Sequence, residues 1–189
     1  VDSLSAAMIE LSNVRFRWHR DAPLVLDIPA FEVRAGERVF LEGPSGSGKT
    51  TLLNILGGVT VPETGRVTVN GVRLGDLSGA GRDRFRADHI GFVFQMFNLI
   101  PYLSPMDNVI LPCQFSQRRK TAAQQRSESV KNEARRLLRH MNLDANMVAA
   151  RPASAFSTGQ QQRIAIARAL MGAPPLVIAD EPTSALDHA

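Results

Sequence analysis

A run of nine residues, Gly-Pro-Ser-Gly-Ser-Gly-Lys-Thr-Thr at 43–51, limits the folds open to this chain more than any other feature. It matches the pattern G-x-x-x-x-G-K-[ST] of a phosphate-binding P-loop, which lies between a strand and a helix. Residues 38–41 are mostly apolar and predict a buried strand before the loop. Residues 50–56 predict a helix after it, which Gly57 and Gly58 end. The stretch therefore predicts a nucleotide-phosphate site in an α/β fold.

Each kind of residue in this loop has a chemical use. Its glycines let backbone N–H groups close around phosphate oxygens, where a Cβ atom would interfere, and the helix N-terminus adds its positive dipole end. The Lys49 ammonium can reach the β- and γ-phosphates of a nucleotide, and the Thr50 hydroxyl can ligate Mg²⁺. The loop residues predicted to bind the nucleotide are Gly43, Pro44, Ser45, Gly46, Ser47, Gly48, Lys49, Thr50 and Thr51.

The composition is that of an ordinary globular protein and excludes several other classes. The 189 residues suffice for one domain with a sizeable core. The single cysteine, Cys113, rules out an internal disulfide framework and suits a reducing compartment. The first residues lack the features of a secretory signal, and no apolar stretch approaches the roughly 18 residues that span a bilayer. A membrane role would therefore come through a partner, and a net charge of +4 gives no argument for nucleic acid.

The first part of the chain is rich in β-favouring segments. Residues 8–18 predict an edge strand whose tip carries the only tryptophan, Trp18, and residues 24–33 predict a second strand. Residues 66–69 alternate as a strand and lead into Asn70-Gly71, a strong hairpin signal. We expect these strands to be antiparallel and to form a β-rich flank beside the nucleotide core.

The middle of the chain changes from strands to helices. Residues 79–86 predict a short helix, and residues 90–94 predict a second buried strand that ends at Gln95. Prolines then punctuate a loop-and-helix region, and residues 124–141 predict one helix with an apolar stripe along a single face. The stripe consists of Val130, Ala134, Leu137, Leu138 and Met141.

These segments predict one α/β domain over residues 1–189, a P-loop core with a mostly parallel sheet. Residues 1–95 and 151–189 form the core with its antiparallel β flank, and residues 96–150 form an inserted helical subdomain. Residues 117–142 hold eight Lys or Arg against two Glu, a local +6 that leaves the rest of the chain at −2. Two explanations stay open for this charge: a solvated helix face, or a contact with anionic lipid headgroups or an acidic partner loop.

A second set of residues, near the C-terminal end, could complete a nucleotide site. Residues 176–179 are an apolar run that predicts a buried strand, and Asp180 and Glu181 follow it directly. Carboxylates at the carboxyl end of a strand suit a magnesium–phosphate site beside a P-loop. Asp180 would hold the metal, directly or through water. Glu181 would orient and deprotonate the attacking water.

The segment before this strand carries a family resemblance. The sequence Phe-Ser-Thr-Gly-Gln-Gln-Gln-Arg at 156–163, followed by an apolar helix, resembles the signature motif of ABC-type ATPases. The P-loop, Gln95, this motif, the Asp180-Glu181 pair and Ser-Ala-Leu-Asp at 184–187 all occur in the order that the family shows. The resemblance covers the chain from about residue 8 to its end.

Two further segments narrow the resemblance. Residues 92–101 and 107–112 look like those of ATPases from lipoprotein-release and macrolide-exporter systems. The resemblance implies an ATP-binding and ATP-hydrolysing subunit that supplies energy to a membrane transporter for export or lipoprotein release. It implies ATP and Mg²⁺ as cofactors, a transmembrane permease as partner, and a place on the cytoplasmic face of the inner membrane. Two such domains, as a homodimer or a pair, would enclose two ATP molecules head to tail.

The resemblance also implies roles for single residues. Ser157, with Gly159 and Gln160, would contact a γ-phosphate held by the opposite subunit. Gln95 would sense Mg²⁺ and the attacking water, and Trp18 would stack on adenine. Simpler roles stay open for three of them: Ser157 as a helix N-cap, Gln95 as a polar strand end, and Trp18 as a packing residue. The predicted catalytic residues are Glu181, Lys49 and Gln95, and the predicted metal ligands are Thr50, Gln95 and Asp180.

Two features depart from the family pattern. The signature usually begins Leu-Ser-Gly-Gly, whereas this chain has Phe156 in place of the leucine and the β-branched Thr158 in place of the first glycine. The chain also ends at Ala189, before the last strands and the switch histidine of the family. His188 does not replace that histidine because it directly follows Asp187. We therefore expect a C-terminally truncated domain.

Other functions are weighed against transport. The same domain could act as an ATP-dependent switch that regulates a membrane or cell-wall partner, and co-purification with a permease would discriminate between the two. A DNA-repair ATPase would carry a long coiled coil or a zinc insertion, for which residues 96–150 are too short and lack cysteine pairs. A degenerate module without turnover is favoured by the early end of the chain and disfavoured by the Asp180-Glu181 pair.

We predict that the 189-residue chain binds MgATP but hydrolyses it slowly, because the switch histidine and the last strands are absent. The measurement is ATP turnover by this chain and by a chain extended at its C-terminus. Equal and robust rates for the two would refute the prediction.

Overall fold

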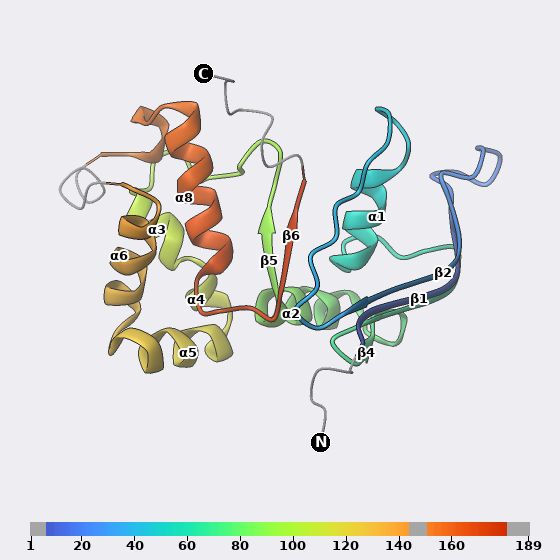
Figure 1. The fold of residues 1–189 in the computed structure, drawn as a ribbon, viewed down its shortest axis with the longest axis horizontal. Helices are drawn as coiled ribbons and strands as arrows, with labels where there is room; N and C mark the ends of the chain where they lie inside the picture. The colour runs from blue at the N-terminus through green and yellow to red at the C-terminus, as the bar shows by residue number, and fades with distance from the viewer. Residues whose placement is uncertain (1–6, 144–150, 181–189) are drawn as a thin grey trace. The chain divides into compact units, whose positions relative to one another are not determined.

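The computed structural model describes residues 7–143 and 151–180 of the chain (Figure 1). Contacts divide the chain into two compact units, residues 1–86 and 87–189, and each is described by itself. The first unit contains the P-loop, and the second contains the strands and helices that carry the other motifs. Glu181 and the Ser-Ala-Leu-Asp segment at 184–187 lie outside the described residues.

The first unit is built on an antiparallel sheet with the strand order β2-β1-β3-β4. Its strands are β1 (Ala7–Phe16), β2 (Leu26–Arg34), β3 (Thr64–Val69) and β4 (Val72–Arg73). Asn70-Gly71 joins β3 to β4, which pair antiparallel as the hairpin signal predicts. The expected antiparallel flank is therefore confirmed.

The prediction that β1 is an edge strand was wrong, because β1 pairs with β2 on one side and with β3 on the other. The buried positions of β1 change from odd to even numbers at Asn13, which has a φ of 51° and lies where the register with β3 shifts. These buried residues are Ile9, Leu11, Val14 and Phe16. The alternation of a strand shows which face is buried, but it does not show how many neighbours the strand has.

A helix follows the P-loop, as the sequence predicts. α1 (Lys49–Leu56) ends at Gly57, whose N–H donates to the Leu53 carbonyl oxygen at 2.9 Å. Ile55 is fully buried on α1, and the helix packs against β3. The short helix η1 (Leu74–Asp76) and α2 (Gly79–His89) follow β4, so the helix predicted at 79–86 exists and extends to His89.

The buried strand predicted at 38–41 is not found. No strand pairing among the described residues includes this segment, and the side chains of Val39 and Phe40 are 51% and 80% exposed. An apolar run favours extended backbone, but a strand also needs a neighbour that satisfies its backbone N–H and C=O groups. The sheet of the first unit does not extend to residues 38–41, so the prediction is wrong for this segment.

The second unit contains a short parallel pair, β5 (Ile90–Val93) and β6 (Leu176–Ala179). Both strands were predicted, and their parallel course is the one expected of the core. β6 is less buried than predicted. Ile178 is only 4% exposed, but its neighbour Val177 is 44% exposed. Within the described ranges β6 pairs with β5 alone, so its sequence indicates a strand but not how much of it is covered.

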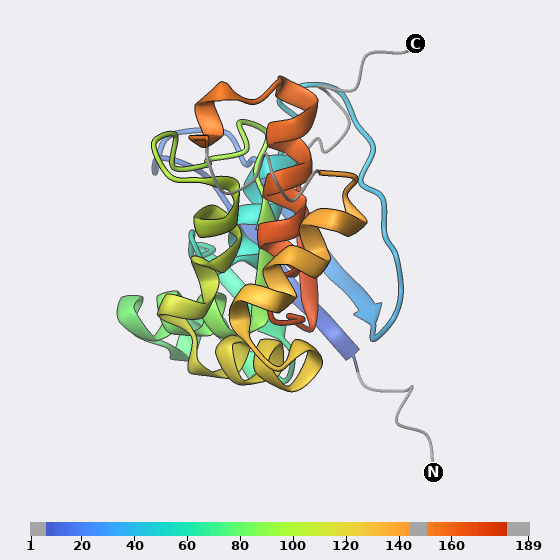
Figure 2. The same ribbon diagram turned by 90° about the vertical axis from the view of Figure 1, so that its left-hand side faces the viewer.

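The other elements of the second unit are helical and gather around the long helix α8 (Thr158–Leu170), which Figures 1 and 2 show. They are α3 (Pro105–Ile110), α4 (Pro112–Phe115), α5 (Gln117–Ser127), α6 (Val130–His140) and η2 (Ala153–Ala155). α8 packs against α3, α6 and β5. Leu137 and Leu138 of α6 share a buried core with Ile164 of α8, so this core holds the helical elements together.

The single helix predicted at 124–141 is in fact two helices. Glu128 lies between them with a φ of 64°, which a helix cannot accommodate. Ser129 then begins α6, because its side chain accepts a hydrogen bond from the Asn132 N–H at 3.1 Å. The apolar stripe is confirmed within α6, where its buried members are Ala134, Leu137 and Leu138.

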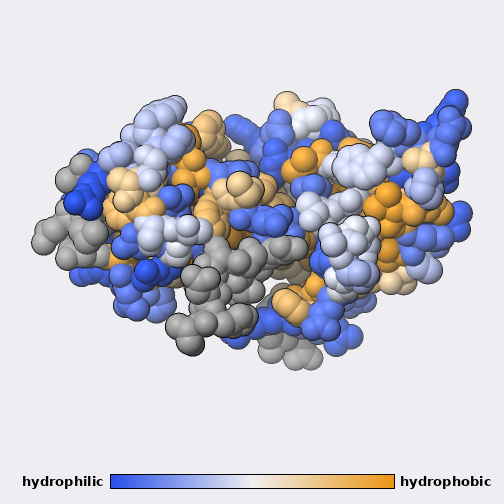
Figure 3. Space-filling view, turned by 90° about the horizontal axis from the view of Figure 1, so that it is seen from above, coloured by the Kyte–Doolittle hydropathy of each residue, from blue (hydrophilic) through white to orange (hydrophobic). Residues whose placement is uncertain are grey.

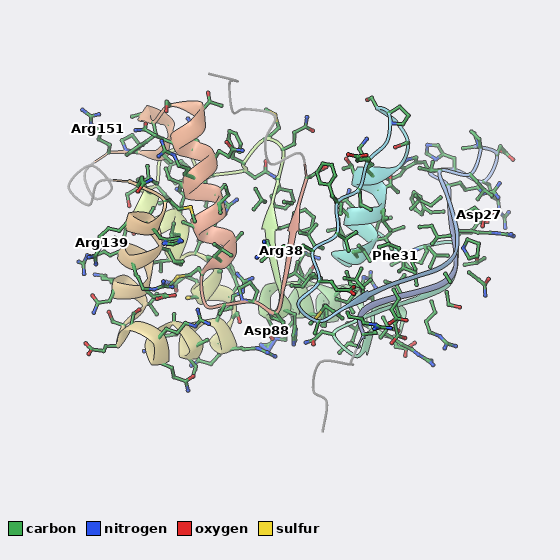
Figure 4. All side chains as sticks on the ribbon, in the orientation of Figure 1. Asp27, Phe31, Arg38, Asp88, Arg139 and Arg151 are labelled. Carbon is green, nitrogen blue, oxygen red and sulfur yellow. The ribbon has the colours of Figure 1, made fainter. Side chains whose placement is uncertain are left out.

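The cations of residues 117–142 do not all face solvent. Arg119 is only 3% exposed, and its Nη2 donates to the Ile90 carbonyl oxygen at 2.7 Å. Burial lowers the pKa of Arg119 to about 10. Arg139, by contrast, lies on the outer, exposed face of α6 (Figure 4). Arg119 is therefore a structural cation.

The surface mixes hydrophilic and hydrophobic areas, which are blue and orange in Figure 3. The exposed large apolar side chains of the described residues include Phe40, Met96, Tyr102 and Phe115. No helix in residues 7–143 or 151–180 has the length and apolar character needed to cross a membrane.

Glu133 allows a test of how α6 is held. Its carboxylate is buried, and it accepts hydrogen bonds from Arg136 at 2.7 and 2.8 Å and from the Ser127 hydroxyl at 2.6 Å. The bonds from Arg136 lower the pKa of Glu133. A lowered pKa means that the ionised form stabilises the fold above the ordinary carboxyl pKa, and that this stabilisation is lost as the pH falls through the lowered value.

We therefore expect Glu133→Gln to lower the free energy of unfolding by about 1–3 kcal/mol at pH 7. The difference from the wild type should shrink as the pH falls through the lowered pKa of Glu133, where its carboxylate becomes protonated. Denaturant titrations at pH 7 and at a series of lower pH values measure it. Glu128→Gln, at an exposed position, is the control and should change stability by less than about 0.5 kcal/mol. A Glu133→Gln protein as stable as the wild type at pH 7 would contradict this account.

Candidate nucleotide-binding site

The P-loop leaves the N-terminus of α1 open. Residues 43–47 are exposed, and Gly48 is the N-cap of α1 with a φ of 92°. The first N–H groups of a helix have no partner within the helix. A glycine N-cap has no side chain to bind them, unlike serine or aspartate. An anion can therefore approach this helix end directly.

Lys49 directs its ammonium into the loop. Its Nζ donates to the carbonyl oxygens of Gly43 at 2.7 Å and Pro44 at 2.9 Å. The cation thus lies where phosphate oxygens can replace these carbonyls as acceptors. Thr50 is exposed beside it, whereas Thr51 is only 7% exposed. A contact from Thr51 to a phosphate would therefore come from its main chain.

Packing connects the P-loop to Trp18 through the sheet. A Cβ atom at Gly48 would lie 2.8 Å from Leu26 Cδ2 and 3.0 Å from the Val25 carbonyl oxygen, so both space and backbone conformation require glycine. Leu26 pairs with Phe16 between β2 and β1. The Phe16 ring meets the Trp18 ring edge to face, with 4.9 Å between centroids and 87° between planes. Trp18 and the P-loop therefore lie at the same end of this sheet.

The second unit brings two predicted metal ligands to one end of its parallel pair. Asp180 follows β6, and its N–H donates to the Val93 carbonyl oxygen at 2.9 Å. Gln95 comes just after Val93 and is exposed. Neighbouring parallel strands deliver the residues that follow them to the same edge. A carboxylate and an amide oxygen are hard donors, so this edge fits a hard cation such as Mg²⁺.

The signature segment forms the N-terminus of α8. The Ser157 hydroxyl accepts from the Gln160 N–H at 3.4 Å, and Gln160 Oε1 accepts from the Ser157 N–H at 2.9 Å. This capping box confirms the simpler role of Ser157 as an N-cap. Thr158 is exposed, and a Cβ atom at Gly159 would meet no other atom within 4 Å. Phe156 is buried in the core of α6 and α8, so it packs as the usual leucine would.

The predicted site residues belong to two different units. Lys49, Thr50 and Trp18 belong to the first unit, and Gln95 and Asp180 belong to the second with the signature segment. Within the second unit, Gln95 and Asp180 follow neighbouring strands at the same end of the parallel pair. Glu181, the predicted base, lies outside the described residues.

Arg168 of α8 was not among the predicted site residues. Its Nη1 donates to the Asn98 carbonyl oxygen and its Nη2 to the Phe97 carbonyl oxygen, both at 2.6 Å. These carbonyls belong to the segment that follows Gln95. The signal in the sequence was an arginine within the mostly apolar run at 164–170, because a charge among apolar residues needs a partner.

An open glycine-rich loop with an inward lysine, on an α/β fold, defines a P-loop nucleotide-binding protein. The family model described as "ABC transporter" matches residues 26–184, and the chain belongs to this family. It is an ATP-binding and ATP-hydrolysing energy-coupling subunit of the ABC type. In this family, ATP-binding domains work with transmembrane partners.

Named relatives cover most of the chain. The uncharacterized ABC transporter ATP-binding protein MJ0796 of Methanocaldococcus jannaschii is 40% identical over 182 residues, which are 95% of this chain and 75% of that protein. The lipoprotein-releasing system ATP-binding protein LolD of Chromohalobacter salexigens is 41% identical over 91% of this chain and 70% of its own length. The macrolide export ATP-binding/permease protein MacB of Chromobacterium violaceum is 42% identical over 97% of this chain, but over only 28% of its own length. The resemblance to both kinds of system is confirmed.

A solved structure has the same fold. The dimeric MJ0796 cassette in a post-hydrolysis state, bound to ADP and Pi, is 39% identical and superposes with a TM-score of 0.82. The match covers 96% of this chain and 77% of the MJ0796 chain. The expected α/β P-loop fold is therefore confirmed.

Trp18 offers a direct test of nucleotide binding. It is the only tryptophan and is 56% exposed, so tryptophan fluorescence reports on this position alone. We expect MgATP to change the emission, because an adenine stacked on the ring would cover its exposed face. Trp18→Ala should weaken ATP binding about five- to ten-fold, and Trp18→Tyr should retain most of the affinity. A titration that leaves wild-type emission unchanged while ATP binds would exclude Trp18 from the adenine site.

Proposed function

We propose that this chain powers a membrane export or lipoprotein-release system through ATP binding and hydrolysis. The carrying observation is that one chain combines an open P-loop, with Lys49 directed into it, and a signature helix that begins at the exposed Ser157. The export class is supported by the relatives LolD and MacB. It is also supported by residues 92–101 and 107–112, which look like those of such systems.

Each predicted residue then has a role in hydrolysis. Lys49 and the loop N–H groups bind the β- and γ-phosphates and balance their charge. Thr50, Gln95 and Asp180 offer hydroxyl, amide and carboxylate oxygens to Mg²⁺, which supplies further positive charge at the phosphates when it is bound. Glu181 orients the attacking water and accepts its proton.

The proposed site is completed by a second ATP-binding domain. Ser157 and Gly159, with Gln160, would meet the γ-phosphate held by the P-loop of that domain. The support is the exposed N-terminus of α8 and the open space around Gly159. A hydroxyl can accept one hydrogen bond and donate another, so Ser157 can cap α8 and still bind a phosphate oxygen. The MJ0796 cassette itself is dimeric in its solved structures.

The family also guides the proposed organisation and location. Residues 1–189 would form one ATP-binding domain in which residues 96–150 are the helical subdomain. A transmembrane permease is the proposed partner, at the cytoplasmic face of the inner membrane, and nucleic acid is not. Co-purification of the chain with a permease would distinguish this function from that of a regulatory switch without transport.

In a chain extended at its C-terminus, we expect Glu181→Gln to reduce ATP hydrolysis by about 10²-fold or more, because the water loses its base while ATP binding is kept. The variant should accumulate as an ATP-bound dimer. Steady-state ATPase assays and light scattering with and without MgATP measure both effects. Lys49→Ala is the contrasting variant, which should lose ATP binding and the dimer together. A Glu181→Gln protein with wild-type turnover would remove Glu181 from this role.

A further inference from the structure

Arg168 holds the main chain that follows Gln95. The two terminal nitrogens of its guanidinium each donate to a different carbonyl oxygen, Nη1 to Asn98 and Nη2 to Phe97, both at 2.6 Å. A planar guanidinium can bind two neighbouring acceptors at once, which a lysine ammonium does less well. The two carbonyls are thus fixed in position relative to α8.

The segment held by Arg168 has an uncommon backbone. Phe97 and Asn98 are consecutive residues with left-handed φ values of 58° and 48°. This conformation costs free energy for residues with a side chain, although Asn tolerates it better than most. The turn is tightened by the Phe97 N–H, which donates to the Phe94 carbonyl oxygen at 2.9 Å, and by the Asn98 N–H, which donates to that of Met96 at 2.6 Å. Gln95 lies within this turn.

A second contact fixes α8 at the other side of the same segment. A Cβ atom at Gly91 of β5 would lie only 2.3 Å from the Ala169 carbonyl oxygen, so strand and helix are in close contact next to Arg168. Burial also lowers the pKa of Arg168, which agrees with a half-buried guanidinium between α8 and the turn. α8 therefore contacts the chain on both sides of Gln95, at Gly91 before it and at Phe97 and Asn98 after it.

We propose that Arg168 is a positioning residue for Gln95. Through the carbonyls of Phe97 and Asn98, Arg168 links α8, the helix that Ser157 caps, to the turn that contains Gln95. A displacement of α8 would then move the Gln95 turn with it. This inference rests on the proposed function, because it assigns a consequence to the metal-binding role of Gln95. A purely structural role of Arg168 would stabilise the fold without affecting that metal site.

The chain offers a matched control in Arg119. It is more buried than Arg168, and it also donates to a main-chain carbonyl, that of Ile90 at 2.7 Å, but at the end of β5 opposite to Gln95. Arg168→Lys and Arg119→Lys should both lower the melting temperature. Only Arg168→Lys should raise the Mg²⁺ concentration for half-maximal ATP hydrolysis, by about five-fold or more, because misplaced ligands bind the metal less well. Equal Mg²⁺ dependence in the two variants would overturn the proposal.

A second pair of variants leaves Arg168 in place. Asn98→Gly keeps the left-handed conformation accessible, whereas Asn98→Ala disfavours it and turns the carbonyl away from Arg168. We expect the alanine variant to shift the Mg²⁺ dependence in the same direction as Arg168→Lys and the glycine variant to stay within two-fold of the wild type. A larger shift for glycine than for alanine would contradict the proposed positioning.

Hydrogen exchange separates this inference from the proposed function. Peptides that cover residues 94–100 should exchange faster in Arg168→Lys than in Arg119→Lys, whether or not the protein hydrolyses ATP. Faster exchange in Arg168→Lys, found together with a wild-type protein that does not hydrolyse ATP, would support the hold of Arg168 on this turn and refute the proposed function instead. Unchanged exchange at these residues in Arg168→Lys would refute the hold of Arg168 on the turn.

Discussion

The close approach of α8 to β5 is the contact on which the second unit depends. At Gly91 the strand passes so near to the helix that an added Cβ atom would lie 2.3 Å from the Ala169 carbonyl oxygen. Only a residue without a side chain allows this distance. From this point β5 continues toward Gln95, while α8 leads back to Ser157. The contact between Gly91 and Ala169 therefore sets how the strand that leads to Gln95 lies against the helix that begins at Ser157.

Two helix N-termini in this chain are completed in different ways. α1 begins after Gly48, which has no side-chain cap, whereas α8 begins after Ser157 and has a full capping box with Gln160. The first arrangement leaves N–H donors for a ligand that the loop encloses. The second satisfies the N–H groups of Ser157 and Gln160 through the capping box, and it presents a hydroxyl proton and an uncrowded glycine at the surface. This difference agrees with the proposed composite site, in which one domain holds the phosphates and another approaches them.

The features that the sequence predicted correctly depend on a few neighbouring residues. The P-loop helix, its end at Gly57 and the Asn70-Gly71 hairpin all follow from local backbone preferences. The failures concern neighbours that are distant in sequence. Residues 38–41 are mostly apolar and yet pair with no strand of the described chain. β1 lies inside the sheet because β2 and β3 pair with it on either side. The break at Glu128 was missed because an apolar stripe indicates a helical face but not an interruption of the helix.

Short sequence motifs were enough to predict the chemistry of this protein: a loop that can surround phosphates, carboxylates after a strand, and a signature that resembles that of the ABC family. These follow from residue types at fixed spacing, which do not depend on the rest of the fold. How these parts are held in place became visible only in the fold. Arg168 showed its partners only when α8 lay against β5, because hydrogen bonds between residues 70 positions apart depend on packing and not on local sequence.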